Sequence, residues 1–254
     1  MTDLCHRLDW DSDFFGYTVG RADVNRLTSE VVAHMNDWCA LHQIDCLYFL
    51  ADPAHYETTW LTQANGFVYV DTRVTLTATL TDPENVSDVL PDSIRVSRVE
   101  DVPALQAIAR SSHRDSRFYF DPVIPAARCD DLFATWIERS VTGKFADVVL
   151  VADVDDEPVG YCALQITERG AKLALIGVSA AARGQGLGTK LVRATLDWFR
   201  QHGYRKVEVV TQGRNVGAQR LYIKHGFHPT ETSNWYHRWS PDILARYSKV
   251  RTGG

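Results

Sequence analysis

Residues 183–188 read Arg183-Gly184-Gln185-Gly186-Leu187-Gly188, with glycine at every second position. They follow an apolar run at 173–178, which predicts a buried strand. Over 187–202 the apolar residues recur at helical spacing, so we expect a helix there. A glycine-rich loop between a strand and a helix presents several backbone N–H groups, and the helix N-terminus adds partial positive charge. The stretch therefore predicts a cradle for phosphate.

The spacing of these glycines separates this loop from other phosphate loops. A P-loop has Lys and then Ser or Thr directly after its last glycine, whereas Gly188 is followed by Thr189 and Lys190. A dinucleotide-binding loop has the spacing GxGxxG, which alternating glycines do not match. The spacing Arg-x-x-Gly-x-Gly instead resembles the pyrophosphate loop of the GCN5-related N-acetyltransferases, the GNAT family.

A second segment resembles the same family. Residues 215–227 contain Asn215, Ala218, Leu221, Tyr222, Gly226 and Phe227 at the spacing NxxAxxLYxxxGF. The resemblance implies that Asn215 contacts the pantetheine arm of acetyl-CoA and that Tyr222 gives a proton to the departing thiolate. A phenol has an ordinary pKa near 10, so Tyr222 is protonated at neutral pH and can act as an acid. Gly226 suits a left-handed helix C-cap, after which Phe227 returns to the core.

The resemblance implies acetyl-CoA as cosubstrate and gives a residue set for it, without a metal. Ile176 and Val178 would pair with the pantetheine arm like an added strand. The backbone N–H of Val178 would stabilise the oxyanion that develops on the thioester carbonyl. The pyrophosphate would lie on Arg183, Gly184, Gln185, Gly186, Leu187 and Gly188.

Composition excludes several other classes of protein. The chain has 254 residues, a hydrophobic fraction of 45% and a formal charge of −5 without a basic run, which argues against nucleic-acid binding. No apolar run approaches the length of a transmembrane helix, and the polar first residues do not resemble a signal peptide. Five cysteines without a CxxC pair predict reduced, mostly buried thiols in a cytoplasmic protein.

The resemblance implies an α/β fold, the GNAT fold, with a mixed central sheet flanked by helices. A polar segment with prolines, 81–91, predicts a linker. A strand at 94–98 and a helix start near Glu100 follow it, as in the opening of GNAT domains. We therefore expect an acetyltransferase domain at 92–254 and a smaller, non-catalytic α/β lobe at 1–80.

The first lobe contains an echo of the second. An offset of 160 positions places the expected strand 47–50 on 207–210, Leu61 on Leu221, and Gly66-Phe67 on Gly226-Phe227. This pattern predicts strand, helix and strand over 46–79, a degenerate copy of half a GNAT domain. The copy lacks the chemistry, because His55 stands in the place of Asn215 and Thr62 in the place of Tyr222. Chance alignment of any strand–helix–strand unit is the alternative.

The acceptor is less well defined than the donor. Residues 8–16 and 116–145 resemble GNAT enzymes that acetylate the amino group of a dTDP-linked amino-deoxy sugar, as in polysaccharide biosynthesis. Within 111–121, Arg117 suits a diphosphate, and Phe118 and Tyr119 suit a base or a sugar face. The alternative is that these aromatic residues pack in the core and the charges lie on a solvated turn.

Several questions stay open at the level of sequence. The general base has four candidates, His113, Asp115, Glu208 and His237, and a water relay is a fifth route. The acceptor could be another small-molecule or protein amine, and the chain could be an acyl-CoA-binding module without activity. A homodimer is suggested by family analogy alone. The stereochemistry of the sugar and the position of its amine do not follow from these residues.

Overall fold

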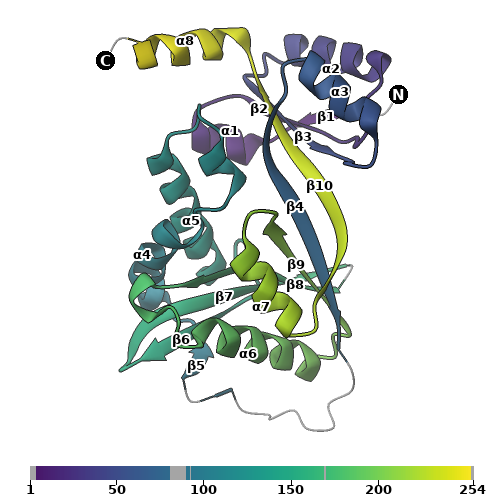
Figure 1. Cartoon of the computed structure of the whole chain (residues 1–254). Coiled ribbons are helices and arrows are strands. Elements are labelled where there is room, and N and C mark those ends of the chain that lie inside the picture. Colours follow the sequence, from purple (N-terminus) through teal and green to yellow (C-terminus); the bar gives the residue numbers. More distant parts are fainter. Residues whose placement is uncertain (1–3, 81–89, 92, 169, 253–254) are drawn as a thin grey trace. The chain divides into compact units, whose positions relative to one another are not determined.

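The computed structural model describes residues 4–80, 90–91, 93–168 and 170–252, with side chains to residue 248 (Figure 1). The predicted linker at 81–91 lies outside the described residues, apart from Leu90 and Pro91. Contacts divide the chain into two compact units. The first unit combines 1–73, 116–125 and 232–254, and the second combines 74–115 and 126–231.

Each unit contains strands and helices. The first unit holds β1 (Cys5–Arg7), α1 (Asp9–Phe15), β2 (Val19–Ala22), α2 (Ser29–Leu41), β3 (Cys46–Ala51), α3 (Tyr56–Ala64), the 3-10 helix η2 (Arg117–Phe120) and α8 (Pro241–Thr252). The second holds β5 (Ile94–Val96), η1 (Val99–Asp101), α4 (Val102–Ser112), α5 (Ala126–Val141), β6 (Val148–Val154), β7 (Glu157–Thr167), β8 (Gly170–Val178), η3 (Ala180–Ala182), α6 (Leu187–Gln201), β9 (Lys206–Gln212) and α7 (Val216–Lys224). Two long strands, β4 (Val68–Thr79) and β10 (His228–Trp239), contribute to both units.

In the first unit the strands follow the order β1-β2-β3-β10-β4. β2 is parallel to β3, and β10 is antiparallel to β3. The sheet packs one face on an apolar core that includes Leu27, Met35, Phe49 and Phe67. Met35 and Phe67 come from α2 and from the turn after α3, so these helices cover that face.

In the second unit the order is β4-β9-β8-β7-β6-β5, and β8 and β9 are parallel. The core joins this sheet to α6, whose buried stripe contains Leu187, Leu191, Thr195, Leu196 and Phe199. These are the residues whose spacing predicts the helix. The mixed sheet and its helices confirm the expected α/β GNAT fold.

The predicted echo is present in the structure. With the offset of 160 positions, α3 and α7 have the same bounds, as do β4 and β10. Gly66 and Gly226 both adopt positive φ, 72° and 83°. The N–H of Phe67 donates to Thr62 O at 3.0 Å, and the N–H of Phe227 to Tyr222 O at 3.2 Å. Residues 46–79 therefore form the expected strand, helix and strand.

The last strands of the two repeats are exchanged. β10 of the second repeat pairs with β3 of the first, with Asn234 opposite Ala51 and Trp239 opposite Cys46. β4 of the first repeat lies beside β9 of the second. The units differ from the predicted division into 1–80 and 92–254, and the exchange accounts for the parts that β4 and β10 contribute. The end of β4 belongs to the second unit, while 116–125 and 232–254 belong to the first.

None of the described helices is long and apolar enough to cross a membrane. None of the five cysteines forms a disulfide in the described structure, and four of them are buried, as expected. Buried thiols fill core positions in both units, since Cys5 lies in the first core and Cys162 in the second.

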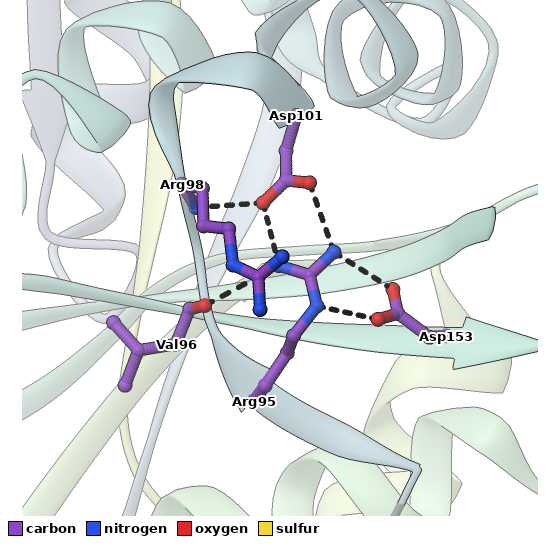
Figure 2. A network of polar contacts seen from close by, with 5 residues as sticks. All are labelled: Arg95, Val96, Arg98, Asp101 and Asp153. Atoms are coloured by element: carbon purple, nitrogen blue, oxygen red, sulfur yellow. Dashed lines mark hydrogen bonds and ion pairs between the residues drawn. The ribbon is translucent and has the colours of Figure 1, made fainter. Parts of the chain in front are cut away.

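An ion-pair network fastens the start of the second unit (Figure 2). Two guanidinium nitrogens of Arg95, on β5, donate to the carboxylate of Asp101 at 2.7 and 2.9 Å. The same side chain binds Asp153 on β6. Asp101 also accepts the backbone N–H of Arg98 at 2.7 Å. The hydrogen bond from Arg95 is the main cause that holds the pKa of Asp101 below its usual value.

We expect Arg95→Met to lower the free energy of unfolding by about 2–4 kcal/mol at neutral pH, because it leaves the buried carboxylate of Asp101 and the half-buried one of Asp153 without their cation. The lowered pKa of Asp101 makes this stabilisation complete above the unfolded pKa, and it is lost as pH falls through the folded pKa. Urea unfolding at about pH 7 and about pH 3 should therefore give a smaller difference at the acid pH. The exposed Arg193→Met serves as control, and equal midpoints for both variants would contradict the role of the network.

Candidate active site

β8 carries a bulge close to the predicted acetyl-CoA residues. Leu164 of β7 lies opposite Leu173, but the next residue back, Ala163, lies opposite Leu175. Ala174 is therefore an extra residue on β8, and such a bulge bends its strand. The described pairing of β8 with β9 covers only 171–173 with 207–209. Among the described residues, β8 pairs with β7 alone beyond the bulge, and its other edge is open.

Backbone donors point to this open edge. The N–H of Ser179 donates to Val159 O on β7 at 2.8 Å. Because backbone groups alternate in direction along a strand, the N–H groups of Ile176 and Val178 point away from β7. Both side chains are partly buried against the second core. The structure thus gives the two predicted strand residues free donors on one edge.

The glycine loop has the conformation that its sequence predicts. Gly184 and Gly186 both have φ of 79°, and a Cβ added at either would meet nothing within 4 Å. Backbone conformation, not crowding, therefore requires glycine at both positions. Gly186 is the N-cap of α6 without a side-chain cap, and the first turn holds no acidic residue. The first N–H groups of α6 are left for an anion.

Gly188 differs from these two glycines. It lies inside α6, where an added Cβ would make an ordinary van der Waals contact of 3.4 Å with a side-chain carbon of Leu221. Neither backbone conformation nor crowding therefore requires glycine at this position.

Arg183 fastens the loop instead of extending from it. Its Nε donates to Val178 O at 3.2 Å and its Nη2 to Ser111 O at 3.4 Å. Arg214 donates to Asp115 O at 3.2 Å. Two arginines thus hold residues 111–115, at the end of α4, against the glycine loop and the end of β9. The side chain of Gln185 donates back to Ala181 O at 3.4 Å, so the backbone amides of the loop are the candidate donors to an anion.

Asn215 and Tyr222 lie on α7. The Oδ1 atom of Asn215 accepts the N–H of Ala218 at 2.9 Å and caps the helix. His55 caps α3 in the same way, because its side chain accepts the N–H of Thr58. The capping role of this position is therefore separate from any role in catalysis. Tyr222 is 3% exposed and its ring lies 5.7 Å from that of Phe227. Burial raises the pKa of the Tyr222 phenol, which keeps its proton in place.

A buried pair beside β8 is not evident from the sequence. His113 Nε2 and the hydroxyl of Tyr161 lie 2.7 Å apart, and burial lowers the pKa of His113 to about 4. The ring of Tyr161 crosses Gly177 so closely that an added Cβ would lie 2.9 Å from it. His113 and Tyr161 are far apart in the chain, so their pairing could not be predicted from local sequence. The glycine at position 177 is the one local sign that a large side chain crosses β8 there.

The remaining predicted residues divide between the units. Asp115 follows α4 and Glu208 lies on β9 opposite Lys172, so both belong to the second unit. His237 belongs to the first, where its Nδ1 lies 2.6 Å from Asp121. Burial is the main cause that lowers the pKa of His237 to about 4.

The three predicted substrate residues, Arg117, Phe118 and Tyr119, lie on η2 in the first unit. Phe118 is 3% exposed and packs on Phe15 with ring centres 5.5 Å apart. Its place in the first unit is therefore that of a core residue. Arg117 and Tyr119 are half-buried.

Comparison with known proteins agrees with this architecture. Residues 109–227 match the acetyltransferase (GNAT) family. The chain is 29% identical over 233 residues to a dTDP-fucosamine acetyltransferase of Escherichia coli, covering 91% of this chain and 96% of that protein. It is 28% identical over 139 residues to the spore coat polysaccharide biosynthesis protein SpsD of Bacillus subtilis, covering 55% and 48%.

Solved structures share the fold. A GCN5-related N-acetyltransferase from Sphaerobacter thermophilus matches with a TM-score of 0.63 at 16% identity, over 92% of this chain and 76% of that one. A tandem GNAT protein from the clavulanic acid biosynthesis pathway matches with a TM-score of 0.54 at 16% identity, over 87% and 75%. With the bulged strand, the glycine loop and the family match together, residues 109–227 form a domain of the GNAT family of acetyltransferases.

Proposed function

We propose that this enzyme transfers an acetyl group from acetyl-CoA to the amino group of a dTDP-linked amino-deoxy sugar. The observation that carries the donor half is the open edge of β8, which begins at the bulge and leads to the uncapped start of α6. An extended pantetheine arm can pair with such an edge, and its pyrophosphate suits the N-terminus of a helix. The residues for acetyl-CoA are then Ile176, Val178, 183–188 and Asn215.

Similarity over nearly the whole chain supports the acceptor half. The relative named as a dTDP-fucosamine acetyltransferase is matched through both units. A polysaccharide biosynthesis protein is matched over a shorter part. Arg117 and Tyr119 remain the candidate acceptor residues, while Phe118 supports them by packing.

The reaction needs few groups. The neutral amine attacks the thioester carbonyl, a C–N bond forms, and the C–S bond breaks. The N–H of Val178 would stabilise the negative charge on the carbonyl oxygen, an effect that is typically worth about a hundred- to a thousandfold in rate. Tyr222 would give its proton to the departing thiolate. The amine proton leaves to a base or to water, and we assign no residue to that step.

A panel of amines tests this function. We expect thiol release from acetyl-CoA with a dTDP-linked amino sugar, and the panel includes both the 4-amino and the 3-amino isomer. A polyamine and a peptide N-terminus should react at least about a hundredfold more slowly in kcat/KM, because they leave the polar groups of the acceptor site unpaired. Faster release with the peptide or the polyamine would contradict the proposed acceptor. Absence of release with every amine, despite acetyl-CoA binding, would favour a binding module.

A further inference from the structure

One face of the first unit's sheet carries polar and aromatic side chains. Arg21 on β2 lies directly opposite Tyr48 on β3, and Tyr48 lies opposite His237 on β10. Residues opposite one another on neighbouring strands share a face, and so does Trp235, two positions before His237. The other face carries the apolar residues of the core, among them Leu47, Phe49 and Tyr236. We call Arg21, Tyr48, Trp235, His237 and the adjoining Arg117 the polar-aromatic face.

Arg117 lies on this face from η2. Its guanidinium carbon is 4.6 Å from the ring centre of Tyr48 and 4.4 Å from that of Trp235. The guanidinium of Arg21 lies 5.5 Å from the Trp235 ring as well. The guanidinium groups of Arg21 and Arg117 thus both lie against the ring of Trp235. The ring orients them but does not neutralise their positive charge.

Three buried nitrogen atoms of this face have no hydrogen-bond partner among the described residues. They are Nη1 of Arg117, Nε of Arg21 and Nε2 of His237. The tautomer of His237 follows from its other nitrogen, because Asp121 can only accept and so Nδ1 carries the proton. Asp121 is held in turn by the indole N–H of Trp239 at 2.8 Å. The face therefore offers two unused donors and one unused acceptor.

This arrangement is unfavourable for a purely structural role. A buried donor left unsatisfied costs about 1–3 kcal/mol, and two neighbouring guanidinium groups repel one another. The carboxylate of Asp11 attracts both guanidinium groups, but it leaves these buried nitrogen atoms without a hydrogen bond. Packing alone would be served as well by apolar residues of similar size. A bound anion would satisfy both donors at once.

We propose that the polar-aromatic face binds the diphosphate of the nucleotide-linked acceptor, with Arg21 and Arg117 donating to its oxygens. This rests on the proposed function and adds Arg21, Tyr48, Trp235 and His237 to the acceptor residues. Guanidinium groups suit phosphate through paired N–H donors. His237 Nε2 accepts from a hydroxyl or imide N–H of the same ligand, a group that an inorganic anion does not have. Trp235 supplies an aromatic surface for the nucleoside.

Calorimetric titration of dTDP and of inorganic pyrophosphate into the full-length protein tests the proposal. We expect Arg21→Gln and Arg117→Gln each to weaken dTDP binding by about ten- to a hundredfold, the size of one lost hydrogen bond between charged groups. Acetyl-CoA binding should be unchanged. Arg7→Gln is the matched control, because Arg7 is exposed on β1 and forms an ion pair with the exposed Asp9. Arg117→Lys keeps the positive charge but not the paired N–H donors of the guanidinium group, so it should weaken dTDP binding by an intermediate factor.

Stability separates a binding role from a structural one. Removing an unpartnered buried donor should leave the melting temperature of ligand-free Arg117→Gln unchanged or raised. A marked fall in melting temperature with unchanged dTDP binding would overturn the proposal. Unchanged binding in both glutamine variants would also overturn it, while the proposed reaction could still stand on the amine panel. Arginine-dependent binding of pyrophosphate that dTDP does not exceed would support the anion site and contradict the nucleotide acceptor.

Discussion

Tyr222→Phe should lower kcat by about a hundred- to a thousandfold, with the KM for acetyl-CoA changed by no more than about twofold. The phenol proton is removed while the ring that packs on Phe227 remains, so the fold should be unaffected. The leaving thiolate would then have to take its proton from solvent. Steady-state kinetics with the best amine of the panel gives both constants, and near-ultraviolet circular dichroism reports the fold.

The pH profile gives a second readout of the same residue. Because burial raises the pKa of Tyr222, the acid stays protonated above the ordinary tyrosine range. The rate at high pH should therefore not fall near pH 10, where an exposed phenol ionises. Tyr204→Phe is the matched control, since Tyr204, like Tyr222, packs against a core phenylalanine, here Phe199. An unchanged kcat in Tyr222→Phe would remove Tyr222 from the mechanism.

Separate expression of 1–80 and 90–254 should give two chains that each lack a cooperative unfolding transition. The first fragment loses β10, which pairs with the whole of β3 and supplies Tyr236 to the first core. The second fragment loses β4, whose Val74 and Leu76 are buried in the second core. Each fragment would expose an unpaired strand edge and an open apolar face, so we expect aggregation. Acetyl transfer should be lost in both.

Coexpression of the fragments should restore a folded, active complex, because the exchanged strands supply the missing partners. A full-length chain with a protease site placed within 81–89 is the control. After cleavage it should remain associated during gel filtration and keep its activity. If 90–254 alone unfolds cooperatively and transfers acetyl groups, the exchange of strands is not needed for folding.

Much of the second unit could be predicted from local sequence. The glycine spacing, the segment from Asn215 to Phe227 and the stripe on α6 are short-range patterns, and helix bounds agree with them within one or two residues. The left-handed conformation of Gly226 follows from the same reasoning. The capping role of Asn215 could also have been predicted, because Asn is favoured before a helix.

Other features depend on contacts between distant parts of the chain. No glycine or proline stands at the bulge, so the sequence does not predict the extra residue Ala174. The pairing of His113 with Tyr161 and the alignment of Arg21, Tyr48 and His237 are set by strand register. Register is determined by the whole sheet, so a single sequence does not reveal it. The division into units was not predicted for the same reason, since it depends on which strand β10 joins.

The exchange of β4 and β10 also separates two kinds of evolutionary constraint. In the first repeat, His55 and Thr62 occupy the motif positions without the family's reactive groups. β4 nevertheless completes the core of the other repeat, so we expect substitutions of its buried residues to destabilise the second unit. The motif residues of the first repeat can therefore change without loss of the fold, whereas the buried residues of β4 cannot. A chain built in this way retains a lobe without the catalytic motif because the active unit is incomplete without it.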